Sequence, residues 1–100
     1  MNEIFFPSQY KKALVTGAKN TTIRIGNERG KYAIGKTYSA KSYTGRDWNL
    51  RVKILKITQT TLGGLLQYGI PKRSIETIQK KENIALNEKV ELVRFETQSS

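Results

Sequence analysis

The sequence contains no cysteine and no histidine, and only 8 of its 100 residues are acidic. Without cysteine there are no disulfides, thiolate metal sites or cysteine nucleophiles, and without histidine the usual zinc ligand and general base are missing. Any chemistry must therefore use lysine, threonine, tyrosine or carboxylate side chains. We accordingly expect no metal and no cofactor.

The sequence also lacks a long apolar run. No segment is long enough to span a bilayer, none combines a large apolar face with a lysine-rich one, and the first ten residues lack the order of a signal peptide. We therefore expect a cytoplasmic protein that does not bind membranes. With 37% hydrophobic residues in 100, the chain can form one small core. We expect a single domain over residues 1–97, a disordered tail over 98–100, and a monomer.

Positive charge is what the sequence has in excess. It contains 18 lysines and arginines, which gives a formal net charge of +10. Residues 1–73 carry 14 basic and 3 acidic side chains, a net charge of +11, whereas residues 74–100 carry 4 and 5, a net charge of −1. This imbalance favours a polyanionic partner, with nucleic acid ahead of an anionic membrane. A basic protein without such a partner is the alternative.

Periodicity and turn residues predict a mixed α+β domain. The predicted helices run from Pro7 to about Thr16, through a weak turn at 62–66, and from Pro71 to about Asn83. The predicted strands are 21–25, 37–43, 50–58 and 89–97. Gly17 is placed to end the first helix. The apolar pattern changes face within the last two strands, which indicates a bulge near Ile54 and Leu55 or a sheet that curls into a barrel.

The stretch from Gly17 to Ile25 is the predicted functional centre. Successive side chains of a strand point to opposite faces, so its two isoleucines are expected to be buried while Thr22 and Arg24 share the open face. Lys19 lies just upstream, where the turn can fold it over them. A hydroxyl, a guanidinium and an amine grouped in this way would suit an anion or a polar base.

The motif Gly17-x-Lys19-x-x-Thr22-Ile23-Arg24, after a short helix and between Phe5-Phe6 and Gly35, resembles that of the ASCH domain family. The resemblance covers about the first 40 residues closely and the remainder by element order. It implies a small PUA-like β-barrel with two or three short helices and an RNA-binding role. Some small bacterial members of the family are amidohydrolases that deacetylate N(4)-acetylcytidine with a lysine, a threonine and a glutamate.

In this sequence the resemblance implies Thr22 as nucleophile, Lys19 as base and Glu82 as proton donor. A lysine acts as a base only where burial or a nearby cation lowers its pKa, and Arg24 would be such a cation. Glu82 lies seven residues after Ile75, so it is expected on the buried stripe of the second long helix. The alternatives are a solvated Lys19, a Thr22 that only builds the strand, and a helix end where Glu82 reaches water.

Two functions therefore compete, with RNA cleavage as a third that the same residues permit. The first is binding of RNA or a nucleoside or nucleotide in a basic cleft, and the second is the amidohydrolase. The expected nucleic-acid contacts are Lys19, Arg24, Arg29, Lys31, Lys41, Tyr43, Arg46, Trp48, Arg51 and Lys53. Tyr43 and Trp48 would stack on unpaired bases. Trp48 could instead cap the core, and Arg24 could instead pair with Glu28 or Glu82.

Overall fold

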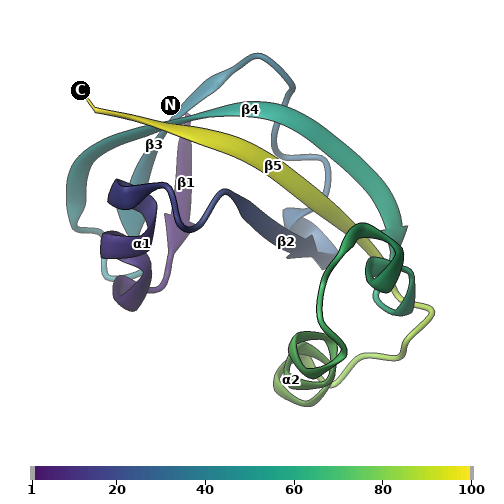
Figure 1. Cartoon of the computed structure of the whole chain (residues 1–100). Coiled ribbons are helices and arrows are strands. Elements are labelled where there is room, and N and C mark those ends of the chain that lie inside the picture. Colours follow the sequence, from purple (N-terminus) through teal and green to yellow (C-terminus); the bar gives the residue numbers. More distant parts are fainter. Residues whose placement is uncertain (1, 100) are drawn as a thin grey trace. The chain divides into compact units, whose positions relative to one another are not determined.

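The computed structural model describes residues 2–99 and contains five strands and two α-helices within that range (Figure 1). The strands are β1 (Glu3–Phe6), β2 (Thr21–Ile25), β3 (Thr37–Ser42), β4 (Asp47–Thr61) and β5 (Lys89–Ser99). The helices are α1 (Lys11–Thr16) and α2 (Lys72–Glu82), with 3-10 helices at Ser8–Tyr10, Gly26–Glu28 and Gly63–Tyr68. The mixed α+β class is as predicted.

The five strands form one sheet in the order β1-β3-β4-β5-β2. β1 is parallel to β3, and β3 is antiparallel to β4. The predicted barrel is wrong, because closure requires the first and last strands of a sheet to pair, whereas β1 and β2 are its two edges. β1 itself was not predicted as a strand, since it pairs with residues more than 30 positions away.

The chain divides into two compact units, each described here by itself. Unit 1 consists of Met1–Thr22, Tyr32–Ile57 and Val93–Ser100, and unit 2 of Ile23–Lys31 and Thr58–Leu92. That residues 1–97 form one domain remains a prediction. No helix within residues 2–99 is long and apolar enough to cross a membrane.

The core of unit 1 is built from one face of its strands. β4 buries every second residue from Trp48 to Ile54, and β3 buries Tyr38 and Ala40. The short helix α1 contributes Leu14, which has no exposed surface. The alternate residues of these strands therefore point away from the core.

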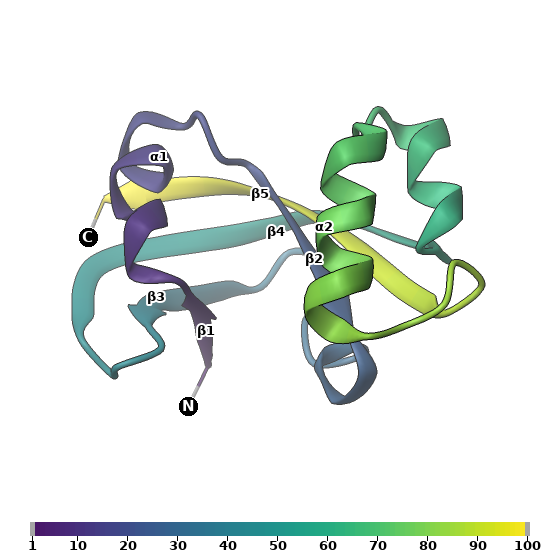
Figure 2. The ribbon, with the colours of Figure 1, turned by 90° about the horizontal axis from the view of Figure 1, so that it is seen from below.

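The core of unit 2 is formed by five buried aliphatic side chains: Leu62, Leu65, Ile75, Val90 and Leu92. The helix α2 lies beside the 3-10 helix that precedes it (Figure 2). Ile23 and Ile25 of β2 pack against this core from its margin. Gly17 (φ 81°) and Gly69 (φ 85°) end helices in the left-handed conformation that favours glycine.

Two local details concern the strands. A register shift lies between Ala40 and Lys41 of β3 in its ladder with β4, where Asn49 has a φ of 56°. Ile54 and Ile57 of β4 are three residues apart and both pack in the core of unit 1, which agrees with the change of face predicted within this strand. The strand β5 continues to Ser99, so Gln98 belongs to the sheet and not to the expected tail. Residue 100 of that tail lies outside the described residues.

Candidate nucleic-acid interface

Lys19 follows the end of α1, and contacts with nearby residues hold its backbone and its side chain in place. Its backbone N–H donates a hydrogen bond to the Ala13 carbonyl at 3.0 Å, which fixes the turn after Gly17. Its Nζ donates to the Thr21 carbonyl at 2.9 Å and lies 4.6 Å from the centre of the Tyr10 ring. The first contact is a hydrogen bond to a carbonyl and the second places the amine over an aromatic face, which favours a cation. These two contacts fix the position of the Lys19 amine.

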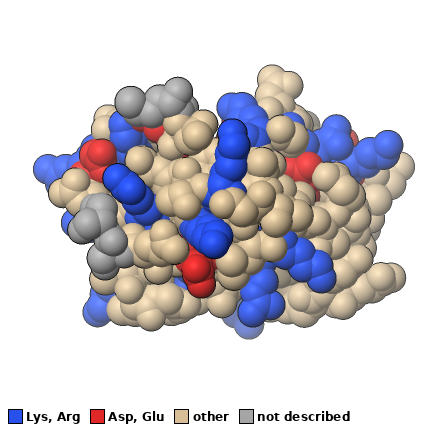
Figure 3. All heavy atoms as spheres, turned by 90° about the horizontal axis from the view of Figure 1, so that it is seen from above, with Lys and Arg blue, Asp and Glu red and all other residues tan. Residues whose placement is uncertain are grey.

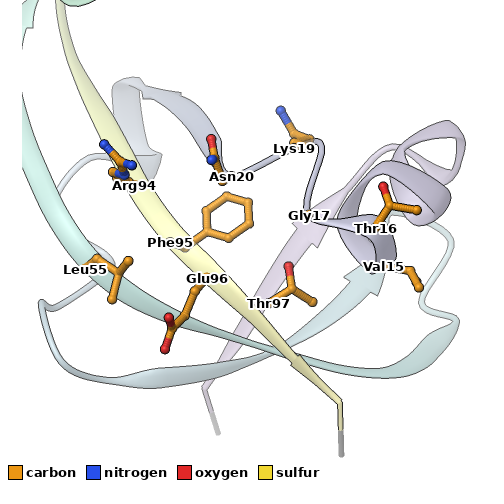
Figure 4. Close-up of a pocket in the computed structure, with 10 residues that line it drawn as sticks. All are labelled: Val15, Thr16, Gly17, Lys19, Asn20, Leu55, Arg94, Phe95, Glu96 and Thr97. Carbon is orange, nitrogen blue, oxygen red and sulfur yellow. The ribbon is translucent and has the colours of Figure 1, made fainter.

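A pocket of about 410 Å³ lies beside this lysine in unit 1 (Figure 4). Lys19 and other residues of the segment 15–20 line it, together with Leu55 of β4 and residues 94–97 of β5. The lining combines apolar groups, such as Leu55, with two cations, Lys19 and Arg94, and one carboxylate, Glu96. A volume of this size is within the range of small-molecule sites. The predicted centre at Lys19 thus adjoins a cavity lined by more basic than acidic side chains.

Thr22 and Arg24 do not occupy the open face predicted for them. Their exposed fractions are 8% and 5%, so both are more buried than Ile23 and Ile25. The alternation was predicted correctly, but β2 is covered on both faces, and the isoleucines are the less buried pair. The Arg24 guanidinium lies 3.5 Å from a Glu28 carboxylate oxygen, which is one of the two ion pairs considered as alternatives. Neither Thr22 nor Arg24 is among the residues that line the pocket.

Glu82 is exposed, and its predicted place on a buried stripe is wrong. It is the last residue of α2, and the chain turns away at Asn83 (φ 53°), so the side chain reaches water. Lys19 and Thr22 belong to unit 1 and Glu82 to unit 2. The catalytic trio Lys19, Thr22 and Glu82 therefore stays a prediction.

The buried carboxylate of unit 2 is instead Glu91, with 3% of its surface exposed. It accepts hydrogen bonds from the Gly30 N–H at 3.0 Å and from the Gln59 amide at 2.5 Å. A carboxylate satisfied in this way joins a loop to a strand, which is a structural role. The sequence signal was present, because Glu91 interrupts the apolar run from Val90 to Val93.

Arg29 and Lys31 are exposed in unit 2. Lys31 forms an ion pair with Glu28 at 2.6 Å. The same glutamate lies beside Arg24, so its carboxylate serves two cations. Because the Glu28 carboxylate partly neutralises Arg24 and Lys31, their electrostatic attraction for an anionic ligand is weaker.

The sheet of unit 1 presents a second group of basic residues. Arg51 and Lys53 alternate with the buried residues of β4 and so point away from the core. Their partners in the ladder are Ser39 and Thr37 of β3, which also point outward. We call this side of β1, β3 and β4 the outer face. Lys41 lies on it and forms an ion pair with Glu3; the hydrogen bond to Glu3 raises the Lys41 pKa, although partial burial opposes it.

The two aromatic residues predicted to stack on bases differ in accessibility. Trp48 is only 8% exposed and belongs to the core of unit 1, so it cannot stack on a base, and the alternative of a core residue holds. Tyr43 is 67% exposed. Its ring lies nearly parallel to that of Phe5, at an interplanar angle of 19° with centroids 6.3 Å apart. Arg46 is exposed in the same turn between β3 and β4.

The net charge is unevenly shared between the two units. Unit 1 contains 10 basic and 3 acidic residues, a net charge of +7, and unit 2 contains 8 and 5, a net charge of +3. Lys and Arg predominate over Asp and Glu on the surface drawn in Figure 3. Among the described residues no group of three or more carboxylates could hold a metal ion.

Arg94 and Asn20 were missed as candidates, although both line the pocket. Arg94 could have been found from the alternation of β5, where it separates the apolar residues Val93 and Phe95. Nothing in the sequence indicated that β5 passes the turn at Asn20, where the Phe95 N–H donates to the Asn20 carbonyl at 2.9 Å.

Comparison with known proteins rests on the fold. No protein-family model matches the sequence, and no curated protein matches it significantly. Among solved structures, the chain is similar to the ASCH domain from Lactobacillus crispatus JV V101, with a TM-score of 0.57 and 10% sequence identity. The similarity covers 86% of this chain and 68% of the other. The chain has an ASCH-like fold.

The ASCH-like fold confirms the resemblance predicted from residues 17–24 and the element order. At 10% identity, the similarity to the Lactobacillus crispatus ASCH domain concerns the fold and does not transfer site residues.

Proposed function

We propose that this ASCH-like protein binds RNA through unit 1, with the pocket beside Lys19 as the site for a nucleotide. The observation that carries the proposal is the fixed Lys19 ammonium, which lines a cavity together with Arg94. Phosphate oxygens are strong acceptors for lysine and arginine donors. The net charge of +7 on unit 1 supports a polyanion over a neutral metabolite.

The pocket lining also suits the other parts of a nucleotide. Val15 and Leu55 provide exposed apolar surface, and Asn20 provides an amide that can both donate and accept hydrogen bonds. A base needs this combination of apolar contact and polar edge recognition. In this proposal Lys19 and Arg94 contact phosphate. Thr22 and Arg24 have a structural role in β2.

The proposal predicts salt-dependent RNA binding that weakens when Lys19 is changed. Affinity for a single-stranded RNA is measured by fluorescence anisotropy over a salt series for the unchanged protein and for Lys19→Gln. The loss of one charge-assisted hydrogen bond should weaken binding by about tenfold. Loss of one phosphate contact should reduce the slope of log affinity against log salt by about 0.7.

Lys12→Gln is the matched control, because Lys12 is exposed on α1 and does not line the pocket. It removes the same charge from the same unit and should change affinity far less. A nucleoside monophosphate added as competitor should displace the RNA from the pocket. Absence of binding at low salt, binding without salt dependence, or equal effects of the two substitutions would contradict the proposal.

The amidohydrolase reading stays a hypothesis that rests on the family resemblance. The Lys19 amine already donates to the Thr21 carbonyl and lies over the Tyr10 ring, and the exposed Glu82 lacks the buried setting expected of a proton donor. We expect no release of cytidine when the protein is incubated with N(4)-acetylcytidine and the products are separated by chromatography. Cytidine release that is lost in Lys19→Ala would establish the enzyme instead.

A further inference from the structure

The outer face of unit 1 is the side of the sheet that points away from the core and from Leu14 of α1. α1 places Leu14 in the core, on the opposite side of the sheet. On the outer face, Arg51 is exposed, and Lys53 and Phe5 are half-buried. An antiparallel sheet commonly has one packed and one solvated face, so exposure alone does not indicate a binding surface. The residue types on this face are more informative.

The cations on this face are arranged in register. Arg51 lies opposite Ser39, and Lys53 lies opposite Thr37, so the two are one outward position apart on β4. Adjacent outward positions on a strand are separated by roughly 6.6 Å. The neighbours of these cations on β3 are small and hydroxylated, so their charges are not neutralised across that ladder.

Aromatic surface adjoins the cations at the other end of β3. Phe5 of β1 lies opposite Lys41 of β3, and Tyr43 follows β3 directly. The rings of Phe5 and Tyr43 are nearly parallel, and Tyr43 is 67% exposed. A tyrosine with this exposure offers a ring face for stacking, while Phe5 supports it from below.

We propose that the outer face of unit 1 binds single-stranded nucleic acid, with one base stacked on Tyr43 and the phosphates beside Arg51 and Lys53. The inference rests on the proposed function and adds a second contact surface, because Tyr43, Arg51 and Lys53 do not line the pocket. Proteins that bind single-stranded nucleic acid without sequence preference combine positive charge along the phosphate backbone with aromatic rings on which bases stack. The outer face offers both. Paired bases are stacked inside a duplex, so the Tyr43 ring would select for single strands. Lys41 contributes less, because it is already paired with Glu3.

The first test separates stacking from charge. Binding of a twelve-nucleotide oligouridylate and of an RNA duplex of the same length is measured by anisotropy for the unchanged protein, Tyr43→Ala and Tyr43→Phe. Tyr43→Ala should weaken binding of the single strand by about 5-fold to 100-fold without changing the salt slope. Tyr43→Phe keeps the ring and should bind as the unchanged protein does. Thermal unfolding of each variant checks that the fold is retained.

The second test separates local from total charge. The double variant Arg51→Gln/Lys53→Gln should lower the salt slope for the single strand by about 1.4, as expected for two lost phosphate contacts. The matched control is Lys80→Gln/Lys81→Gln, which removes two exposed cations from α2 in unit 2 and should leave the slope nearly unchanged.

The outcomes separate this inference from the proposed function. If RNA binds and depends on Lys19, but Tyr43→Ala is without effect and the two double variants behave alike, the outer face is not an interface and the pocket proposal stands. Equal affinity for duplex and single strand would also overturn the inference. If the unchanged protein does not bind RNA, both proposals fail.

Discussion

Lys41 and Glu3 form an ion pair between β3 and β1, with about a fifth and a quarter of their side chains exposed. The hydrogen bond to Glu3 raises the Lys41 pKa above its ordinary value of 10.5. A raised lysine pKa in the folded state means that folding favours the protonated form. The stabilisation is therefore fully present below pH 10.5 and is lost as the pH rises through the higher pKa of the folded protein.

This sign leads to a prediction for Lys41→Met. Thermal unfolding followed by circular dichroism should show a lower melting temperature for the variant than for the unchanged protein at pH 8. The difference should shrink at pH 11.5, where the amine of the unchanged protein also loses its charge. Lys36→Met, at an exposed position, should have no comparable effect. A difference that is the same at both pH values would show that packing, and not charge, is responsible.

Individual site residues were predictable from sequence only where local geometry decides their role. Lys19 follows a helix that ends at Gly17, and this local arrangement does place it beside a cavity. Glu82 and Glu91 show where prediction from local sequence fails. Both are carboxylates near apolar residues in the sequence, but only Glu91 is buried, because burial depends on segments that are distant along the chain.

At the scale of elements, the 3-10 helix Gly63–Tyr68 depends on two adjacent glycines that differ in their surroundings. A β-carbon at Gly64 would lie 2.4 Å from Thr60 Oγ1 and 3.0 Å from Thr61 Oγ1. The Thr61 hydroxyl accepts a hydrogen bond from the Gly64 N–H at 3.0 Å. Because real β-carbon contacts essentially never fall below 3.0 Å, a methyl group at Gly64 would force the Thr60 side chain out of its present rotamer.

We expect Gly64→Ala to lower the free energy of unfolding by about 1–3 kcal/mol through overpacking. Gly63→Ala places its β-carbon no closer than 3.4 Å to neighbouring atoms, and we expect it to change stability by less than about 1 kcal/mol. Urea unfolding of the two variants provides the comparison. Equal destabilisation would indicate that loss of backbone freedom, and not the contact with Thr60, sets the cost.

Helices and strands with local signals were predicted well, and pairing between distant strands was not. Gly17 and Asn83 end the two α-helices near the predicted positions, because capping depends on a few adjacent residues. The strand β1 and the open edge of the sheet were not predicted. Parallel pairing of β1 with β3 joins two segments that are separated by α1, β2 and two 3-10 helices, and the periodicity of neither segment indicates this pairing.

At the scale of the whole molecule, two hydrophobic clusters occur with no described residue in common. Leu14 in unit 1 and Leu65 in unit 2 are both fully buried. Truncation of a fully buried leucine to alanine costs about 2–5 kcal/mol. Leu14→Ala and Leu65→Ala are therefore matched probes of the two clusters.

We expect hydrogen exchange to separate the two variants. Leu65→Ala should accelerate exchange of backbone amides in 58–92 more than in 32–57, and Leu14→Ala should do the reverse, because local opening follows the weakened cluster. Mass spectrometry after deuterium labelling would resolve these segments. A uniform acceleration in both variants would show one cooperative unit, as predicted from the sequence for residues 1–97.

The sequence alone determined the charge, the missing residue types, the helix ends and the alternation within strands, because each of these depends on composition or on neighbours a few positions apart. Tertiary structure decided which face of an alternating strand is the more deeply covered, which carboxylate is enclosed, and that Trp48 joins the core while Tyr43 remains exposed. These outcomes depend on which distant segment packs against each face, and a period of two or 3.6 residues carries no information about that partner.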